Sequence, residues 1–214
     1  PRIFCCDARE IMPEQRIFRY DRASHLGHGK GSVAGFSDLF RYALLAKYGG
    51  WWTDMDMTCL GRLPETIGYC FRSHHKLPAV GNLMHCPPNS MLMAHCLEET
   101  KKLVHSGSRD WMLPIRILNN NIKKFLLVGE IREITNPDSW WTIRRFLLSA
   151  PVEFPANWVA LHWNNTDWQR LQLLQDEGLP GSKYGALMQE HGIHLGPLSA
   201  AAKRRVALRL SLPW

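Results

Sequence analysis

Two aspartates separated by one residue, Asp54 and Asp56, are the side chains of this 214-residue chain with the clearest chemical potential. They follow Trp51 and Trp52 in an aromatic and apolar run that is typical of a strand. Carboxylates this close repel each other, and burying them is costly unless a cation or hydrogen-bond donors neutralise them. Hard oxygen ligands suit Mg²⁺ or Mn²⁺, which keep positions open for water and substrate phosphates. The pair predicts a divalent-metal site, and the alternative is a buried strand with a solvated acidic tip.

A second polar pair, Asp38 and Arg41, precedes these aspartates. Apolar residues at helical spacing predict a helix from Val33 to Tyr48, which places Asp38 and Arg41 on one face. Ser32 can cap the start of this helix, and Gly49 can supply the left-handed residue that ends it.

After the two glycines that follow this helix, the pattern changes to a period of two. A strand running through both aspartates would carry Trp52, Asp54 and Asp56 on one face. The tight glycine connection would bring Asp38 and Arg41 close to the end of that strand. Both polar pairs are therefore expected to converge on one small volume.

Residues 37–57, SDLFRYALLAKYGGWWTDMDM, resemble the sugar-binding DXD region of retaining glycosyltransferases of the GT-A fold. This group includes bacterial lipopolysaccharide and capsule sugar transferases, eukaryotic α-1,4-glycosyltransferases and the glucosylating clostridial toxins. In that pattern, an S-D-x-x-R-Y helix runs through K-Y-G-G into a strand that ends in D-x-D. An isolated D-x-D often arises by chance, whereas the arrangement over about twenty positions is specific. The resemblance implies an α/β fold of GT-A type, with a Rossmann-related mixed sheet flanked by helices.

The resemblance also implies a reaction and a role for each residue. A hexose or N-acetylhexosamine would move from a nucleoside-diphosphate sugar, expected to be a UDP sugar, to a hydroxyl of a glycan or glycolipid with retention at the anomeric carbon. Asp56 would bind Mn²⁺ or Mg²⁺ directly, and Asp54 would bind it directly or through water while contacting the ribose. Asp38 would accept hydrogen bonds from donor-sugar hydroxyls, and Arg41 would hold a sugar hydroxyl or phosphate-side oxygens. No residue suggests a covalent nucleophile, so a same-face attack assisted by the leaving phosphate is expected.

Two more candidate residues come from later segments. Residues 159–168 predict a strand that delivers His162, and they resemble the H-W-N element that returns to the DXD metal in these transferases. We expect His162 to be a third metal ligand or a diphosphate contact, and the alternative is a histidine packed between Trp163 and Trp168. These tryptophans could shelter the diphosphate, stack on a sugar or form core. Asn82 stands where the family often has an Asn, so it is either a donor-sugar or acceptor contact or a simple turn residue.

The whole chain, residues 1–214, is expected to form one glycosyltransferase domain with a basic helical tail over residues 170–214. It opens with PRIFCCDAREIMP, which predicts a strand followed by a helix, and we expect the first nucleotide-binding strands of the resembled family to be missing before it. Further helices are predicted over Ser90 to Ser106 and Leu113 to Phe125. Leu113 and Pro114 replace the Gly-Pro of the family, and this departure concerns the acceptor side.

The chain is basic, with a formal net charge of +7 and a pI near 9.3. Such a surface can attract anionic membrane lipids, a phosphorylated glycan or nucleotide sugar, or nucleic acid. The basic residues are dispersed except for a group near the end of the chain: Lys203, Arg204, Arg205 and Arg209. This distribution favours an anionic acceptor, or peripheral membrane contact through the tail, over nucleic acid.

The cysteines and histidines favour no further metal centre. The six cysteines have no metal or redox spacing, so we expect reduced thiols in a cytoplasmic protein. The basic tail adds the expectation of peripheral contact at the inner face of the membrane. The histidine pairs lack companions at zinc-ligand spacing. Two rival functions stay open. One is a non-catalytic nucleotide-sugar or carbohydrate-binding module or an inactive fragment, and the other is a basic nucleic-acid-binding or metal-nuclease domain.

Overall fold

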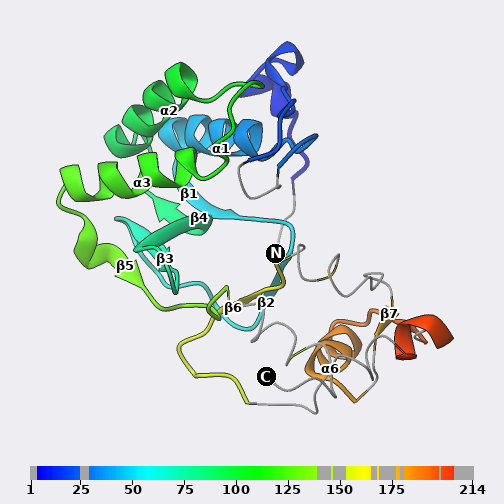
Figure 1. Ribbon diagram of the computed structural model, residues 1–214. Coiled ribbons are helices and arrows are strands. Elements are labelled where there is room, and N and C mark those ends of the chain that lie inside the picture. The colour runs from blue at the N-terminus through cyan, green and yellow to red at the C-terminus, as the bar shows by residue number, and fades with distance from the viewer. Residues whose placement is uncertain are drawn as a thin grey trace. The chain divides into compact units, whose positions relative to one another are not determined.

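The computed structural model describes residues 4–24, 29–138, 146, 153–164, 168, 177–178, 181–197 and 199–204. The chain forms two compact units (Figure 1). The first unit comprises Pro1–Asp54 and Glu65–Arg132, and the second comprises Met55–Pro64 and Glu133–Trp214. The chain leaves the first unit directly after Asp54, inside the D-x-D sequence. That the two units act as one glycosyltransferase domain stays a prediction.

Helix α1 of the first unit, Ala34–Tyr48, begins one residue later than the sequence predicts. Val33 is its N-cap residue, while the Ser32 hydroxyl accepts a hydrogen bond from the Ala34 N–H at 3.1 Å. Gly49 ends the helix with φ of 64°, as predicted. A Cβ at this position would lie 2.4 Å from the Pro88 nitrogen, so close packing also requires glycine here.

The sheet of the first unit is mixed. Its strands are β1 (Gly50–Thr53), β3 (Cys70–Ser73), β4 (Ala79–Cys86) and β5 (Ile131–Arg132), in the order β1-β4-β3-β5. Strand β4 is antiparallel to both of its neighbours, and β5 runs parallel to β3. Every residue of β4 is buried, which explains its nearly continuous apolar sequence.

Three helices form a layer over this sheet (Figure 1): α1, α2 (Met91–Leu103) and α3 (Leu113–Lys124). The two later helices agree with their predicted ranges to within a few residues. The Ser90 side chain caps α2, and the Asn119 amide on α3 bonds both the N–H and the carbonyl of Ala79 at 2.9 and 2.8 Å. The fold class is therefore mixed α/β, compatible with the GT-A type.

The hydrophobic core of the first unit lies where these helices meet the sheet. It consists of aromatic, aliphatic and thiol side chains, among them Tyr42, Leu45, Phe71, Met84, Leu92, Met93, Cys96 and Leu118. Tyr42 also donates a hydrogen bond to the Pro114 carbonyl at 3.0 Å, which satisfies its buried hydroxyl. Because Tyr42 and Leu45 of α1 are held in this core, the rotation of the helix about its axis is fixed, and with it the direction of the polar side chains of α1.

The opening segment differs from the prediction of a strand and a helix. Its described part, from Phe4, contains two short 3₁₀ helices, η1 (Ala8–Glu10) and η2 (Glu14–Arg16), and no strand. The Asp7 side chain accepts from the Arg9 N–H and caps η1, and Pro13 prevents the turn from continuing as an α-helix. A 3₁₀ helix, η3 (Val128–Glu130), also precedes β5.

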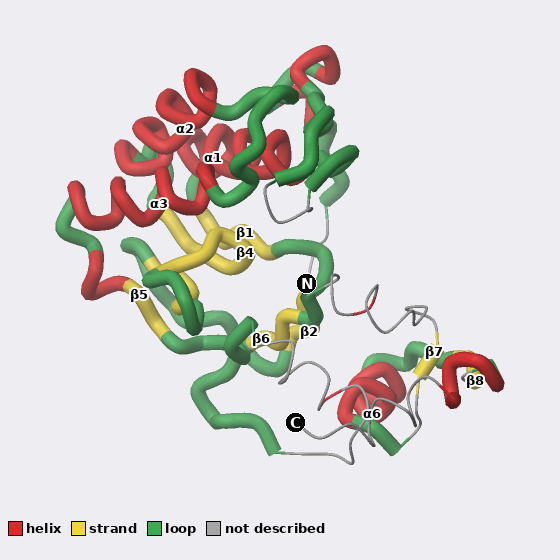
Figure 2. Tube along the Cα trace, viewed as in Figure 1, coloured by secondary structure: helices red, strands yellow, loops and turns green. Residues whose placement is uncertain are grey.

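The second unit contains a two-stranded antiparallel sheet of β2 (Met57–Cys59) and β6 (Ala160–His162), shown in Figure 2. Met57 is paired with His162 in this register. Strands β7 (Glu177–Gly178) and β8 (Gly196–Pro197) form a short parallel pair. Helix α6, Lys183–Glu190, begins at Ser182, whose hydroxyl accepts from the Gly185 N–H at 3.1 Å.

The basic helical tail over residues 170–214 stays a prediction, and helix α6 is the longest helix that the structure describes within it. Tyr184 and Leu187 of this helix pack in a core cluster with Trp163 and Trp168. The ring centroids of Trp163 and Tyr184 are 4.8 Å apart in an edge-to-face arrangement, so the tryptophans serve packing. Helix α6 therefore has one face buried in the core of the second unit, and membrane contact by the tail stays a prediction.

The basic group that motivated membrane contact extends past the described residues, since Arg205 and Arg209 lie outside them. Among the residues that the structure describes, no helix has the length and apolar character that crossing a membrane requires.

Candidate functional site

The D-x-D sequence does not continue the strand, which corrects the expectation of two carboxylates on one strand face. Strand β1 ends at Thr53, residues 55 and 56 form a turn, and β2 starts at Met57. The Asp54 N–H still donates to the Asn82 carbonyl of β4 at 2.9 Å, whereas the Asp56 carbonyl accepts from Trp163, next to β6. The backbone exchanges one strand partner for another between the two aspartates, and this exchange requires the turn.

In the first unit, Arg41 joins Asp38 to Asp54. Its Nη1 donates to Asp38 Oδ1 and its Nη2 donates to Asp54 Oδ1, both at 2.9 Å. The Arg41 side chain is only 6% exposed, and that of Asp38 is 11% exposed. One guanidinium is thus shared between two carboxylates, and α1 brings its polar face to the end of β1.

Two further residues, neither of them among the predicted site residues, hold this network. Trp52 Nε1 donates to Asp54 Oδ1 at 2.7 Å, and the Arg41 guanidinium carbon lies 5.0 Å from the centroid of the Trp52 ring. Gly81 leaves room for the guanidinium, because a Cβ there would lie 2.3 Å from Arg41 Nη1. The strand period does place Trp52 on the same face as Asp54, but no sequence pattern identifies Gly81.

The charge of Asp38 is disfavoured in this setting. Burial raises the pKa of Asp38, Arg41 lowers it and Asp54 raises it further, so that it lies at about 6 instead of the ordinary 3.8. Burial is the largest of these effects, and it outweighs the attraction to Arg41. Asp38 is therefore a carboxylate that the fold holds at a cost.

In the second unit, His162 lies between two carboxylates. Its Nε2 is 3.3 Å from Asp56 Oδ2, and its Nδ1 is 2.6 Å from Asp138 Oδ1. The structure thus brings Asp56 and His162 together, and it adds Asp138, which was not among the predicted site residues. No periodicity connects Asp138 to His162, because they lie in separate segments.

The two carboxylates decide the charge of His162. Burial alone lowers the pKa of His162, but the hydrogen bonds with Asp138 and Asp56 together outweigh it and raise the pKa to about 9. The imidazole is therefore protonated at neutral pH in the protein without metal.

A family model described as a glycosyltransferase sugar-binding region containing a DXD motif matches residues 15–72. These residues are similar to that family's sugar-binding region. The match includes Asp38, Arg41, Asp54 and Asp56, and it ends before Asn82 and His162. No curated protein and no solved structure matches the chain. The match supports a glycosyltransferase with a sugar-binding region.

DXD glycosyltransferases generally use a divalent metal, and the geometry of Asp56 and His162 fits one. Two atoms that bind one cation at about 2.1 Å and at a right angle lie about 3 Å apart. The observed distance of 3.3 Å between Asp56 Oδ2 and His162 Nε2 is close to that value. The two side chains would hold the ion at neighbouring positions. Direct binding by Asp54, and the choice between Mn²⁺ and Mg²⁺, stay predictions.

A complete protein cage for a metal is not found within the described residues. No group of three or more His, Cys, Asp or Glu side chains there could hold a metal ion. An ion bound by Asp56 and His162 would leave positions for water and substrate oxygens, as Mg²⁺ sites in phosphate-handling enzymes do.

Asn82 lies within strand β4, so the interpretation as a simple turn residue is wrong. Its side-chain oxygen accepts from Nη1 of the fully buried Arg72 at 2.9 Å, and its backbone carbonyl accepts from Asp54. Asn82 therefore helps to anchor the first aspartate of the motif. Its contact with donor sugar stays a prediction.

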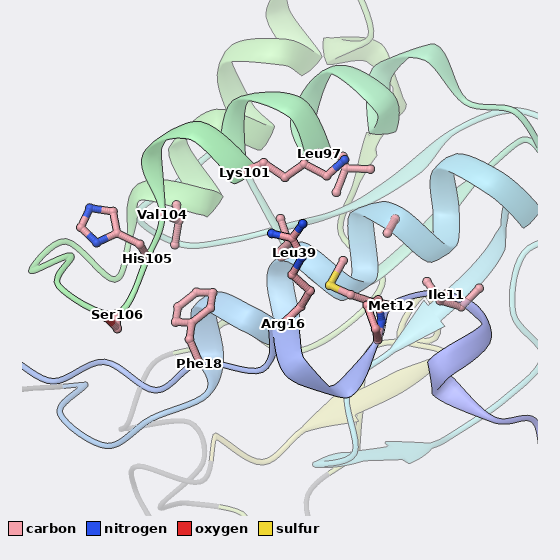
Figure 3. A pocket seen from close by; sticks show the side chains of 12 residues that line it. Ile11, Met12, Arg16, Phe18, Leu39, Leu97, Lys101, Val104, His105 and Ser106 are labelled. Carbon is pink, nitrogen blue, oxygen red and sulfur yellow. The ribbon is translucent and has the colours of Figure 1, made fainter.

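A pocket of about 670 Å³ in the first unit lies apart from these polar groups (Figure 3). It is formed by the opening segment, α1 and α2, with Met12, Phe18, Leu39 and Val104 among its apolar lining residues. None of the predicted site residues is among those that line it. It is therefore not a candidate for the donor-sugar site.

Proposed function

We propose that this glycosyltransferase is metal-dependent and retaining, and that it transfers a hexose or N-acetylhexosamine from a nucleoside-diphosphate sugar, with UDP as the nucleotide, to a hydroxyl of a glycan or glycolipid. The pairing of Asp56 with His162 carries the proposal, because an imidazole nitrogen and a carboxylate oxygen at 3.3 Å suit one divalent ion. The match of residues 15–72 supports the sugar-transfer chemistry.

The network around Arg41 supports a role in holding the donor. Asp38 would accept hydrogen bonds from hydroxyls of the donor sugar. Hydrogen bonds to a buried, charged carboxylate are stronger than those to a neutral or exposed acceptor. Arg41 would direct its positive charge at a sugar hydroxyl or at phosphate-side oxygens. Because Trp52 and Asp54 fix the guanidinium on one side, little reorganisation is needed when the donor binds.

The aspartates of the motif would divide the work. Asp54 Oδ1 receives hydrogen bonds from Arg41 and Trp52, and within the described structure Oδ2 receives none, so Oδ2 can accept from a ribose hydroxyl. Asp56 and His162 would hold the cation, which supplies positive charge that stabilises the diphosphate as it leaves. No side chain stands out as a covalent nucleophile, so the acceptor would attack from the face that the leaving phosphate vacates.

The experiment that tests the proposal is the substitution Asp56→Ala. Transfer and donor hydrolysis that depend on Mn²⁺ should be lost, with the far-ultraviolet circular dichroism spectrum unchanged. Glu133→Gln, an exposed carboxylate in the same unit, is the matched control and should behave as the unmodified protein. Full activity of the Asp56→Ala protein in the presence of EDTA would overturn the proposal.

A second candidate function is a nucleotide-sugar-binding module without catalysis. The observation that favours it is the departure of Leu113 and Pro114 from the Gly-Pro of the resembled family, on the acceptor side. Such a module would bind a UDP sugar with Mn²⁺ but leave the donor intact over long incubation. Hydrolysis of the donor by the unmodified protein, lost in Asp56→Ala, decides for the enzyme.

A further inference from the structure

Residues 135–138, T-N-P-D, run beside strand β6 and contact the residue at its end. Thr135 forms a parallel bridge with Ala160, two residues before His162. The Val159 N–H also donates to the Ile134 carbonyl at 2.9 Å. This segment therefore acts as a short partner for β6, although only one of its residues pairs through the backbone bridge.

Asn136 continues the pairing with its side chain. Its Oδ1 accepts from the His162 N–H at 2.7 Å, and its Nδ2 donates to the His162 carbonyl at 3.0 Å. Asn136 is completely buried. Both backbone groups of His162 are thus bound by one amide, which replaces a strand neighbour and fixes where the Cα–Cβ bond of His162 points.

Asp138 then fixes the ring. The 2.6 Å contact between Asp138 Oδ1 and His162 Nδ1 is a short, charge-assisted hydrogen bond. Nδ1 keeps its proton against this carboxylate, so Nε2, on the opposite side of the ring and 3.3 Å from Asp56, is the nitrogen that can present a lone pair.

We propose that Asp138 is a positioning residue that holds His162 in the Nδ1–H form and aims Nε2 at the metal position beside Asp56, with Asn136 fixing the backbone from which the ring extends. This inference rests on the proposed metal-dependent function. It assigns Asp138 no direct contact with the ion, because Asp138 bonds the nitrogen on the far side of the ring. The lack of a three-residue metal group in the described part of the chain agrees with that assignment.

The first experiment measures Mn²⁺ binding to the whole chain by electron paramagnetic resonance. Asp138→Asn keeps the shape of the side chain, but its amide can donate to Nδ1 and so stabilise the other tautomer, in which Nε2 carries the proton. Mn²⁺ affinity should fall about 10- to 100-fold, the range seen when a partner of a metal-binding histidine is lost. Asp138→Glu, which keeps the acceptor, should recover part of the loss, and Glu133→Gln should bind as the unmodified protein does.

The second experiment reads the tautomer without metal. Nitrogen-15 NMR of the His162 ring at about pH 10, above its pKa of about 9, should show the proton on Nδ1 in the unmodified protein and on Nε2 in Asp138→Asn. A melting curve for each variant shows whether it is folded. If Asp138→Asn is not folded, Asp138→Ala, which also removes the acceptor for Nδ1, is measured in its place. An unchanged tautomer together with Mn²⁺ affinity within about twofold of the unmodified protein would overturn the assignment.

The two experiments separate the inference from the function on which it rests. If the unmodified protein binds no Mn²⁺ but Asp138→Asn moves the ring proton, the metal-dependent function fails and the orientation of His162 by Asp138 stands. If Mn²⁺ binds tightly and the ring proton does not move, Asp138 is a structural ion-pair partner and the inference fails alone.

Discussion

The cost of keeping Asp38 charged can be measured by Asp38→Asn. The buried network has two carboxylates, Asp38 and Asp54, for the single guanidinium of Arg41. The pKa of Asp38 is about 6 in the folded protein and 3.8 ordinarily. This difference of about two pKa units means that the ionised carboxylate lowers the free energy of unfolding by about 3 kcal/mol. Asn keeps the size and an acceptor oxygen for Arg41 Nη1 but carries no charge.

The expected result is a more stable and less active protein. Removing one partner of a buried ion pair usually destabilises a protein by about 3–5 kcal/mol, because the other charge is left alone. Arg41 is not left alone here, since Asp54 still accepts from its Nη2 at 2.9 Å. Asp38→Asn should therefore raise the free energy of unfolding by about 1–3 kcal/mol at about pH 8, while transfer falls about 100-fold or more because a donor-sugar contact is lost.

The stability difference between Asp38→Asn and the unmodified protein should depend on pH in a defined direction. The folded protein holds the Asp38 proton over a pH range in which the unfolded chain has already released it, so the stability from Asp38 is present below about pH 4 and is lost as the pH rises through about 6. Urea denaturation at several pH values should show the two proteins equally stable near pH 4, within about 0.5 kcal/mol, and diverging above it.

A matched control is available on α2. Glu98 and Lys101 form an ion pair with the same i, i+3 spacing as Asp38 and Arg41, but their side chains are 60% and 47% exposed. Glu98→Gln removes the same charge from an exposed, solvent-screened pair and should leave the stability nearly unchanged at every pH. Our reasoning is refuted if Asp38→Asn is less stable than the unmodified protein at about pH 8, or if its effect is equal at both ends of the pH range.

Two further predictions concern the room around Arg41 and the proton on His162. Gly81→Ala places a methyl group 2.3 Å from the present position of Arg41 Nη1. We expect transfer, measured as donor turnover, to fall about tenfold or more, and the free energy of unfolding, measured by urea denaturation, to fall by about 1–3 kcal/mol. Unchanged turnover would contradict the packing argument. Because the pKa of His162 is about 9, a metal ion must displace the proton of the imidazole to bind it. The Mn²⁺ affinity, measured by calorimetry, should therefore rise about tenfold per pH unit between about pH 6 and 8. The control, His162→Ala, should lack this slope. An equally steep slope in the control would assign the proton to another group.

From the sequence alone it was possible to predict helix α1, its end, and the polar residues of the candidate site. Helix α1 followed from apolar spacing, and its end followed from a glycine that alone tolerates the left-handed conformation. The i, i+3 relation of Asp38 and Arg41 is a property of any helix, so their contact could be predicted before the fold was known. The likeness over residues 37–57 named the chemistry, and the family match over residues 15–72 agrees with it.

Only the tertiary structure decided which partner each aspartate of the motif receives. An alternating strand pattern predicts the side-chain faces only as far as the strand keeps the same neighbour. No sequence pattern shows that β1 ends its pairing with β4 at Asp54, or that the Asp56 carbonyl bonds to the residue after β6. The space that Gly81 leaves for Arg41 and the contact of Asp138 with His162 are likewise set by packing between segments far apart in the chain. Local periodicity reports the face on which a side chain lies, whereas the group that meets that face depends on strand pairing and packing, which no single segment encodes.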